Sequence, residues 1–162
     1  MLRMINETKL LQASLLIASR SQENGNLPFG CLLADKDGTI LEEAENSVLS
    51  DQDCIAHCEI NLVHQLAGKY DESFLQECTL YASTEPCPMC TGAIFWSGIG
   101  KIVFALSKNG YHAIAGTTNP AHIFDFSAGE LLQYGGRKVI VSGPLKEMDA
   151  SIFYKELLRL SV

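Results

Sequence analysis

The sequence has no long apolar run and few basic residues, and each absence bears on the class of protein. No apolar run approaches the roughly 18 residues that a membrane-spanning helix needs, so we expect no membrane partner. Lys and Arg number 12 against 19 Asp and Glu, which gives a net charge of −7. Because phosphate binding relies on clustered Lys and Arg, this balance disfavours a nucleic-acid partner and favours a small molecule.

The sequence also lacks an apolar stretch at its start. Asn6 and Glu7 stand where a signal peptide would begin its apolar segment, so we expect a cytoplasmic location. Six cysteines are present, and cytosolic thiols stay reduced, which favours metal binding and burial over disulfides. We find no internal repeat, and a chain of 162 residues predicts one domain over 1–162.

Hydrophobic periodicity and turn residues predict an α/β fold with a mixed sheet. Residues 107–125 read as one long irregular segment, and such segments are often functional. The strands at 101–106 and 138–141 are separated by enough chain for a crossover, so we expect them to be parallel. The other predicted elements are helices at 6–20, 56–67, 88–97, 128–134 and 145–160, a hairpin of 29–34 with 39–46, a loop at 50–53 and a strand at 79–84.

Two short stretches carry the chemistry, Ala56-His57-Cys58-Glu59 and Pro86-Cys87-Pro88-Met89-Cys90. Imidazole nitrogen and thiolate sulfur are ligands that zinc favours, so His57, Cys87 and Cys90 are the expected metal ligands. Cys87 and Cys90 lie three residues apart at a predicted helix start, which places both sulfurs on one side and stabilises thiolates. Pro88 suits the first helical turn because that position needs no N–H.

Three protein ligands leave a fourth zinc position for water, whose pKa the metal lowers to roughly 7. Glu59 lies two residues from His57 and has a carboxylate that can exchange protons with this water. We therefore expect a hydrolytic site with Glu59 as its catalytic residue. The alternative is a structural site closed by Cys54 as a fourth ligand, in a non-catalytic zinc-stabilised interaction module.

This pattern, H-x-E followed by P-C-x-x-C, resembles that of the zinc-dependent cytidine deaminase superfamily. The resemblance implies a three-layer α-β-α sandwich with a mixed five-stranded sheet, one Zn²⁺ per chain and hydrolytic deamination with release of ammonia. It also implies a homodimer. Cys58 departs from the pattern, because the family usually has Ala, Gly or Val between the His and the Glu.

By the same resemblance, Asn46, Phe29 and the backbone of Ala56 would contact the substrate. The run 93–96 is similar to that of bacterial guanine deaminases, which adds Trp96 to the expected substrate-binding residues. Residues 90–94 and 36–38 look equally like fungal cytosine deaminase, but the C-terminal residues 151–155 lack its acidic aromatic ending.

The sequence thus favours a purine base or nucleoside, with guanine first. Cytosine deaminase and tRNA adenosine deaminase are the alternatives.

The remaining candidates are weaker. His112, His122 and Phe124 lie in the predicted irregular segment and could line or cover the pocket or be exposed. Cys31, Cys58 and Cys78 are expected to pack in the core, because free cysteines are commonly buried.

Overall fold

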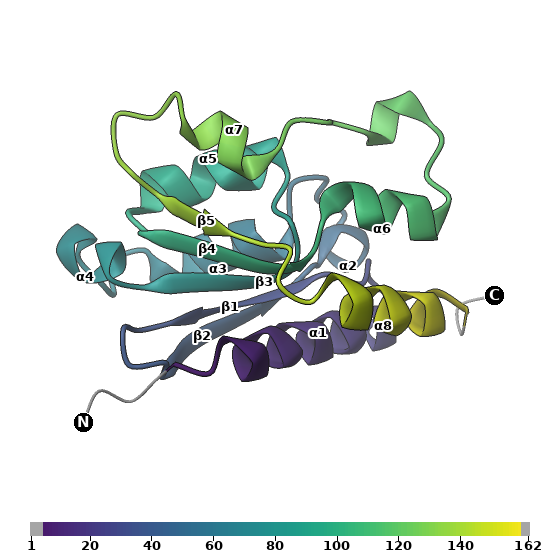
Figure 1. Cartoon of the computed structure of the whole chain (residues 1–162), viewed down its shortest axis with the longest axis horizontal. Helices are drawn as coiled ribbons and strands as arrows, with labels where there is room; N and C mark the ends of the chain where they lie inside the picture. The colour runs from purple at the N-terminus through teal and green to yellow at the C-terminus, as the bar shows by residue number, and fades with distance from the viewer. Residues whose placement is uncertain (1–4, 160–162) are drawn as a thin grey trace.

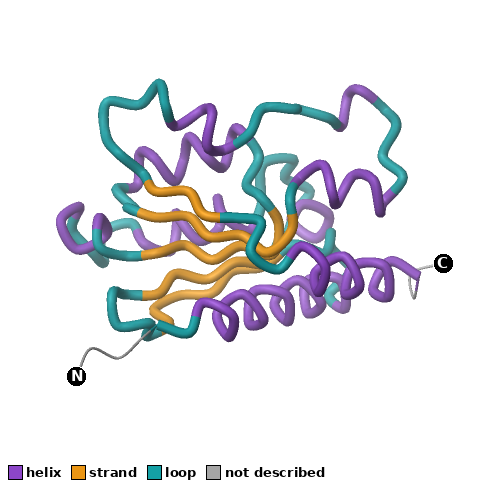
Figure 2. Tube along the Cα trace, in the orientation of Figure 1, coloured by secondary structure: helices purple, strands orange, loops and turns teal. Residues whose placement is uncertain are grey.

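A five-stranded mixed sheet forms the centre of the computed structural model, which describes residues 5–159 (Figures 1 and 2). The strand order is β2 (Ile40–Glu45), β1 (Gly30–Ala34), β3 (Thr79–Thr84), β4 (Lys101–Leu106) and β5 (Ile140–Ser142). The pairs β1–β2 and β1–β3 are antiparallel, whereas β3–β4 and β4–β5 are parallel. The predicted hairpin and the predicted parallel pair are therefore confirmed.

Helices cover both faces of the sheet and complete the predicted three layers (Figure 1). Side chains of the central strands alternate between the two faces, so Leu80 and Ala82 join one core cluster and Tyr81 joins the other. The first cluster lies under α3 (Cys58–Leu66), α5 (Pro88–Ser97) and α7 (Ala128–Leu132). The second lies under α1 (Glu7–Glu23), α8 (Glu147–Arg159) and part of α6 (Lys108–Ala115).

Helix α1 approaches β1 so closely that Gly30 has no room for a side chain. A Cβ atom on Gly30 would lie 2.5 Å from the backbone nitrogen of Ala18, well inside van der Waals contact. Two atoms of Ile17 would lie at 2.6 and 2.7 Å, so a larger residue at position 30 would force α1 away from β1.

The prediction of one irregular segment over 107–125 is wrong. The segment contains α6 and the 3₁₀ helix η1 (Pro120–His122). Gly110 resembles a helix breaker in the sequence, but α6 continues through it, and a Cβ there would lie 2.6 Å from Oε1 of Glu147. Ser107 caps α6 by accepting a hydrogen bond from the Gly110 N–H at 3.1 Å.

Several smaller differences concern short helices and element ends. The structure adds α2 (Val48–Asp51), which overlaps the predicted loop at 50–53, and α4 (Glu72–Gln76), both too short for periodicity to reveal. The helix predicted from residue 56 begins at Cys58, and the last strand is shifted to Ile140–Ser142. Position 160, the predicted end of the last helix, lies outside the described residues. No helix within 5–159 is both long and apolar enough to span a bilayer.

Candidate active site

The three expected metal ligands come from the starts of two helices on the same face of the sheet. His57 is the N-cap residue of α3 and Cys87 is the N-cap residue of α5, and both have extended backbone conformations. Neither side chain caps its own helix, so both are free to point elsewhere. Pro88 occupies the first turn of α5, as expected from its missing N–H, and Cys90 follows within the same turn.

The donor atoms of these residues converge. Nδ1 of His57 lies 3.7 Å from Sγ of Cys87 and 3.6 Å from Sγ of Cys90. All three donor atoms lie within 4.8 Å of one another, and no other group of three or more His, Cys, Asp or Glu donors within 5–159 does so.

A tetrahedral zinc ion, with Zn–S near 2.3 Å and Zn–N near 2.0–2.1 Å, places nitrogen and sulfur ligands about 3.6 Å apart. The cluster therefore fits zinc in both donor chemistry and spacing.

Cys54 does not complete a four-ligand site. Its side chain is exposed, and it is absent from the cluster of donor atoms. The arrangement is thus the open one, with three protein ligands, that characterises catalytic zinc sites. This geometry disfavours the closed structural site that the sequence left open.

Hydrogen bonding within the cluster changes the acidity of its members. Hydrogen bonds from the Cys90 thiol and then from His57 lower the pKa of Cys87 to about 4, against the opposing effect of burial. The hydrogen bond to Cys87 raises the pKa of His57 above its ordinary value. A thiolate at Cys87 is the form that binds a metal ion.

Glu59 lies beside the cluster in the first turn of α3 and is only 6% exposed. Burial raises the pKa of its carboxyl group above the usual value, while its own backbone N–H and the charge of His57 act in the opposite direction. A carboxylate whose pKa is raised binds a proton more readily than an ordinary carboxylate, which favours a role in proton transfer. Glu59 is therefore suited to proton transfer at this site.

Asn46 is buried, and one polar atom of its side chain has no hydrogen-bond partner. Its Oδ1 accepts a hydrogen bond from the N–H of Val48 at 3.1 Å, which fixes the orientation of the amide. Its Nδ2 is buried without a hydrogen-bond partner, which ordinarily costs about 1–3 kcal/mol. A ligand that accepts a hydrogen bond from Nδ2 would remove this cost.

Phe29 adjoins Asn46 through the backbone, since its carbonyl accepts the Asn46 N–H at 3.0 Å. The Phe29 ring contacts Tyr111 of α6, with 4.7 Å between ring centroids.

Ala56, directly before His57, is buried, but both of its backbone groups already have partners. Its N–H donates to Asp53 and its carbonyl accepts from Ser47.

Trp96 is not brought to the cluster. It lies in the last turn of α5, nine positions after Cys87, which corresponds to roughly 13 Å along a helix. Its side chain is 84% exposed. Within one chain it therefore faces solvent rather than the metal-binding residues.

The remaining cysteine, histidine and phenylalanine candidates lie in different environments. Cys31, Cys58 and Cys78 are buried in the core on the α3–α5 side, as predicted. His122 and Phe124 are exposed. His112 lies in α6, with its Nδ1 buried.

Glu85 and Lys108 hold the two ends of segment 107–127 together, and no sequence pattern indicates this role. Glu85 lies in the short loop 85–87 that leads into α5 and carries Cys87, here called the metal-binding loop. It accepts hydrogen bonds from the N–H groups of Lys108 and Ala128, at 3.3 and 3.0 Å. Lys108 is buried, and its Nζ donates to the carbonyl of Phe126 at 2.6 Å. Together they close the base of segment 107–127 and tie it to the metal-binding loop. Their partners lie far apart in the sequence, so periodicity cannot reveal them.

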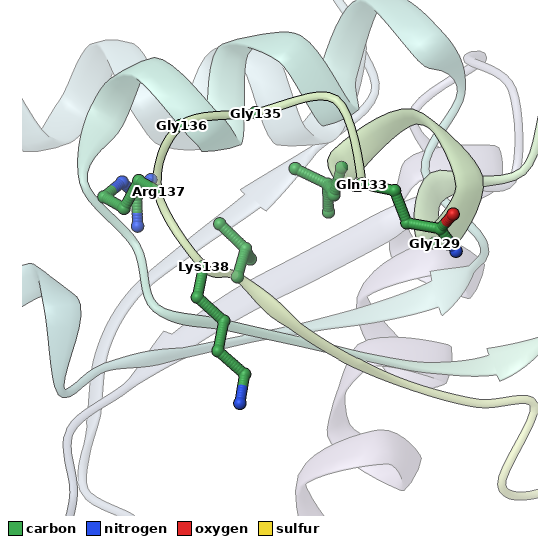
Figure 3. A pocket seen from close by; sticks show the side chains of 8 residues that line it. Gly129, Gln133, Gly135, Gly136, Arg137 and Lys138 are labelled. Atoms are coloured by element: carbon green, nitrogen blue, oxygen red, sulfur yellow. The ribbon is translucent and has the colours of Figure 1, made fainter.

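A surface hollow of about 430 Å³ lies elsewhere, between α7 and the start of β5 (Figure 3). Its Arg137 is already engaged by the end of α5, where it donates to the carbonyls of Phe95, Gly98 and Ile99. The hollow contains none of the metal-binding residues. It is a feature of the α5–α7 packing and not of the reaction site.

The fold and the open three-donor site define a zinc-dependent hydrolase of the deaminase class. A family model described as the cytidine and deoxycytidylate deaminase zinc-binding region matches residues 4–106. The chain belongs to this family, whose zinc site is typically formed as it is here by His57, Cys87 and Cys90, and whose members hydrolyse C–N bonds.

Relatives of this chain have different names. A probable cytosine deaminase of Schizosaccharomyces pombe is 32% identical over 145 residues, covering 90% of this chain and 88% of that protein. A guanine deaminase of Bacillus subtilis is 36% identical over 102 residues, covering 63% of this chain and 65% of that protein.

A solved structure of a mutant protein in complex with 8-azaguanine has the same fold. It superposes with a TM-score of 0.78 over 96% of this chain and 86% of that one, at 22% identity.

Proposed function

We propose that the protein deaminates a free purine base or nucleoside, with guanine as the preferred substrate. The main observation behind the proposed deamination is that the buried Glu59 lies beside a metal site with only three protein ligands. The unpartnered Nδ2 of Asn46 supports a substrate that presents a hydrogen-bond acceptor, as a nucleobase does.

His57, Cys87 and Cys90 would hold a zinc ion, which when bound would supply Lewis acidity for activating a water molecule. Glu59 takes up a proton from the attacking water and delivers it to the departing amine. With guanine, an oxygen–carbon bond forms at C2, the C2–N bond breaks, and xanthine and ammonia are the products. Asn46 orients the ring through Nδ2, and Phe29 and the backbone of Ala56 contribute to the wall against which the ring lies.

Support for guanine comes from residues 93–96, which resemble the bacterial guanine deaminases, and from the Bacillus subtilis relative. Cytosine is the second candidate, because the Schizosaccharomyces pombe relative is similar over 90% of this chain. Adenosine in tRNA is a weaker alternative, since a net charge of −7 opposes binding to a polyanion.

The test is ammonia release from guanine, guanosine, cytosine, cytidine, adenine and a tRNA substrate by the zinc-loaded protein. We expect guanine to give the highest kcat/KM. Preference for cytosine would replace the proposed substrate and keep the reaction class. Release from none of them would overturn the proposal.

We further propose that residues 1–162 form one deaminase domain that works in the cytoplasm as a homodimer. All six cysteines are free thiols in the structure, which suits a reducing compartment. Trp96 and Tyr134 are 84% and 85% exposed on the adjacent elements α5 and α7–β5, and a second copy of the chain would cover them.

A further inference from the structure

Buried side-chain atoms without a hydrogen-bond partner are confined, within residues 5–159, to two residues. One is Nδ2 of Asn46 and the other is Nδ1 of His112. Such atoms are rare in folded proteins, because leaving a buried polar group unpaired is unfavourable. Asn46 already has a role in the proposed site, whereas His112 has none.

A continuous set of contacts connects the two residues. The Asn46 N–H donates to the carbonyl of Phe29 at 3.0 Å, and the Phe29 ring contacts Tyr111 at 4.7 Å between centroids. His112 follows Tyr111 in the chain, and their ring centroids lie 6.0 Å apart. Helix α6 therefore packs Tyr111 against Phe29 and places His112 beside Tyr111.

The position of α6 is fixed by hydrogen bonds at its start. The Ser107 N–H and hydroxyl both donate to the carboxylate of Glu147, at 2.9 and 2.8 Å. The Lys108 N–H donates to Glu85, which lies in the metal-binding loop. A helix tied in this way to the loop of Cys87 can hold a side chain at a constant place relative to the metal-binding residues.

The side of α6 on which His112 lies is also defined. Lys108 and His112 are four residues apart and so lie on the same face of the helix. Lys108 is buried on that face and donates through Nζ to the carbonyl of Phe126, the far end of segment 107–127. His112 thus lies on the inward side of the segment, one turn beyond its closed base.

We propose that His112 is a substrate-binding residue, whose Nδ1 forms a hydrogen bond with the ring edge of the nucleobase. This inference rests on the proposed function. A neutral imidazole can present Nδ1 as a donor or as an acceptor, depending on the tautomer, and the edge of a nucleobase presents both kinds of group. Asn46, whose amide orientation is fixed, contributes only a donor. His112 therefore adds discrimination that Asn46 cannot supply.

The test compares two variants of nearly equal size, His112→Asn and His112→Leu, with the wild type as full-length zinc-loaded proteins. Asn places an amide atom near the position of Nδ1, and Leu removes the polar atom. Ammonia release gives kcat and KM for guanine and for cytosine, and calorimetry gives the Kd of 8-azaguanine. Zinc content and Tm report whether each variant is folded, and the exposed His64, changed to Ala, serves as a control.

We expect His112→Leu to weaken 8-azaguanine binding and to raise the KM of the preferred base by roughly tenfold or more, because a buried polar group of the substrate then lacks its partner. His112→Asn should recover most of this loss, and His64→Ala should match the wild type. If the wild type is active and both His112 variants bind and turn over within twofold of it, the inference is overturned and the proposed function stands. A wild type that is inactive on every base overturns both.

Discussion

The carboxylate of Glu85 accepts a hydrogen bond from the backbone N–H of Lys108 at 3.3 Å, and this contact joins the metal-binding loop to helix α6. The second carboxylate oxygen of Glu85 accepts the N–H of Ala128 at the start of α7. One side chain thereby fixes both ends of segment 107–127. The segment includes His112, so its position relative to the metal-binding residues depends on Glu85.

Replacing Glu85 should loosen this connection without removing the metal. We expect Glu85→Ala to lower the free energy of unfolding by about 1–3 kcal/mol, since two helix-start N–H groups lose their acceptor. The KM should rise more than kcat falls, and zinc content should stay unchanged. Denaturant unfolding and steady-state kinetics measure these effects.

Glu85→Gln provides a graded comparison, because its amide has one acceptor oxygen and can keep one of the two hydrogen bonds. The exposed Glu156, changed to Ala, is the control. Wild-type stability and KM in Glu85→Ala would contradict this role.

The metal site makes a separate prediction about cysteines. Cys87→Ser and Cys90→Ser should each lose most of the zinc and lower Tm, because binding of the ion stabilises the folded chain. Cys54→Ser should keep zinc, since Cys54 is exposed and outside the cluster. Elemental analysis of the purified variants measures zinc directly. Loss of zinc from Cys54→Ser would restore the closed four-ligand site as an explanation.

Substitutions at Asn46 can distinguish the structural role of Oδ1, which accepts the Val48 N–H, from the proposed role of Nδ2 in substrate binding. Asn46→Asp keeps an acceptor for the Val48 N–H but removes the donor at Nδ2, whereas Asn46→Ala removes both. We expect both variants to raise the KM by roughly tenfold or more, and Asn46→Ala to lose the Val48 hydrogen bond as well. Kinetics with thermal unfolding distinguishes the two effects. An unchanged KM in Asn46→Asp would exclude Nδ2 from substrate binding.

The exposed aromatic residues Trp96 and Tyr134 are the basis of the proposed homodimer. Light scattering during gel filtration should give about twice the chain mass of 17.7 kDa for the wild type. Trp96→Glu should shift the protein toward the monomer, because a charge in an apolar interface is unfavourable. The exposed Leu16, on the opposite face of the sheet, offers a control as Leu16→Glu. A wild-type mass of one chain at micromolar concentration would rule out the proposed dimer.

Much of the metal centre could be predicted from the sequence because its residues are local. Cys87 and Cys90 lie within one helical turn, so their spacing alone indicates a shared side, and His57 and Glu59 lie only two residues apart in the H-x-E pattern. The buried strands at 79–84 and 101–106 also have the bounds that the sequence predicts, because their β-branched, aromatic and apolar residues are consecutive in the chain.

Segment 107–127 was less predictable because its structure depends on distant partners. Glu147, 37 residues after Gly110, lies against this glycine of α6, and Glu85 supplies the acceptor for Lys108. The exposure of Trp96 likewise follows from where α5 ends relative to the sheet, which its residue type does not reveal.

The most direct test of the proposed catalytic role of Glu59 compares Glu59→Ala with the wild type. Two quantities are measured: the zinc content per chain and the ammonia released from the base that the wild type prefers. The exposed Glu23, changed to Ala, serves as the control. We predict that all three proteins hold about one zinc per chain and that only Glu59→Ala loses activity, by roughly 10²- to 10⁴-fold, because proton transfer to the leaving amine is lost. A Glu59→Ala protein with full zinc and wild-type turnover would contradict the account.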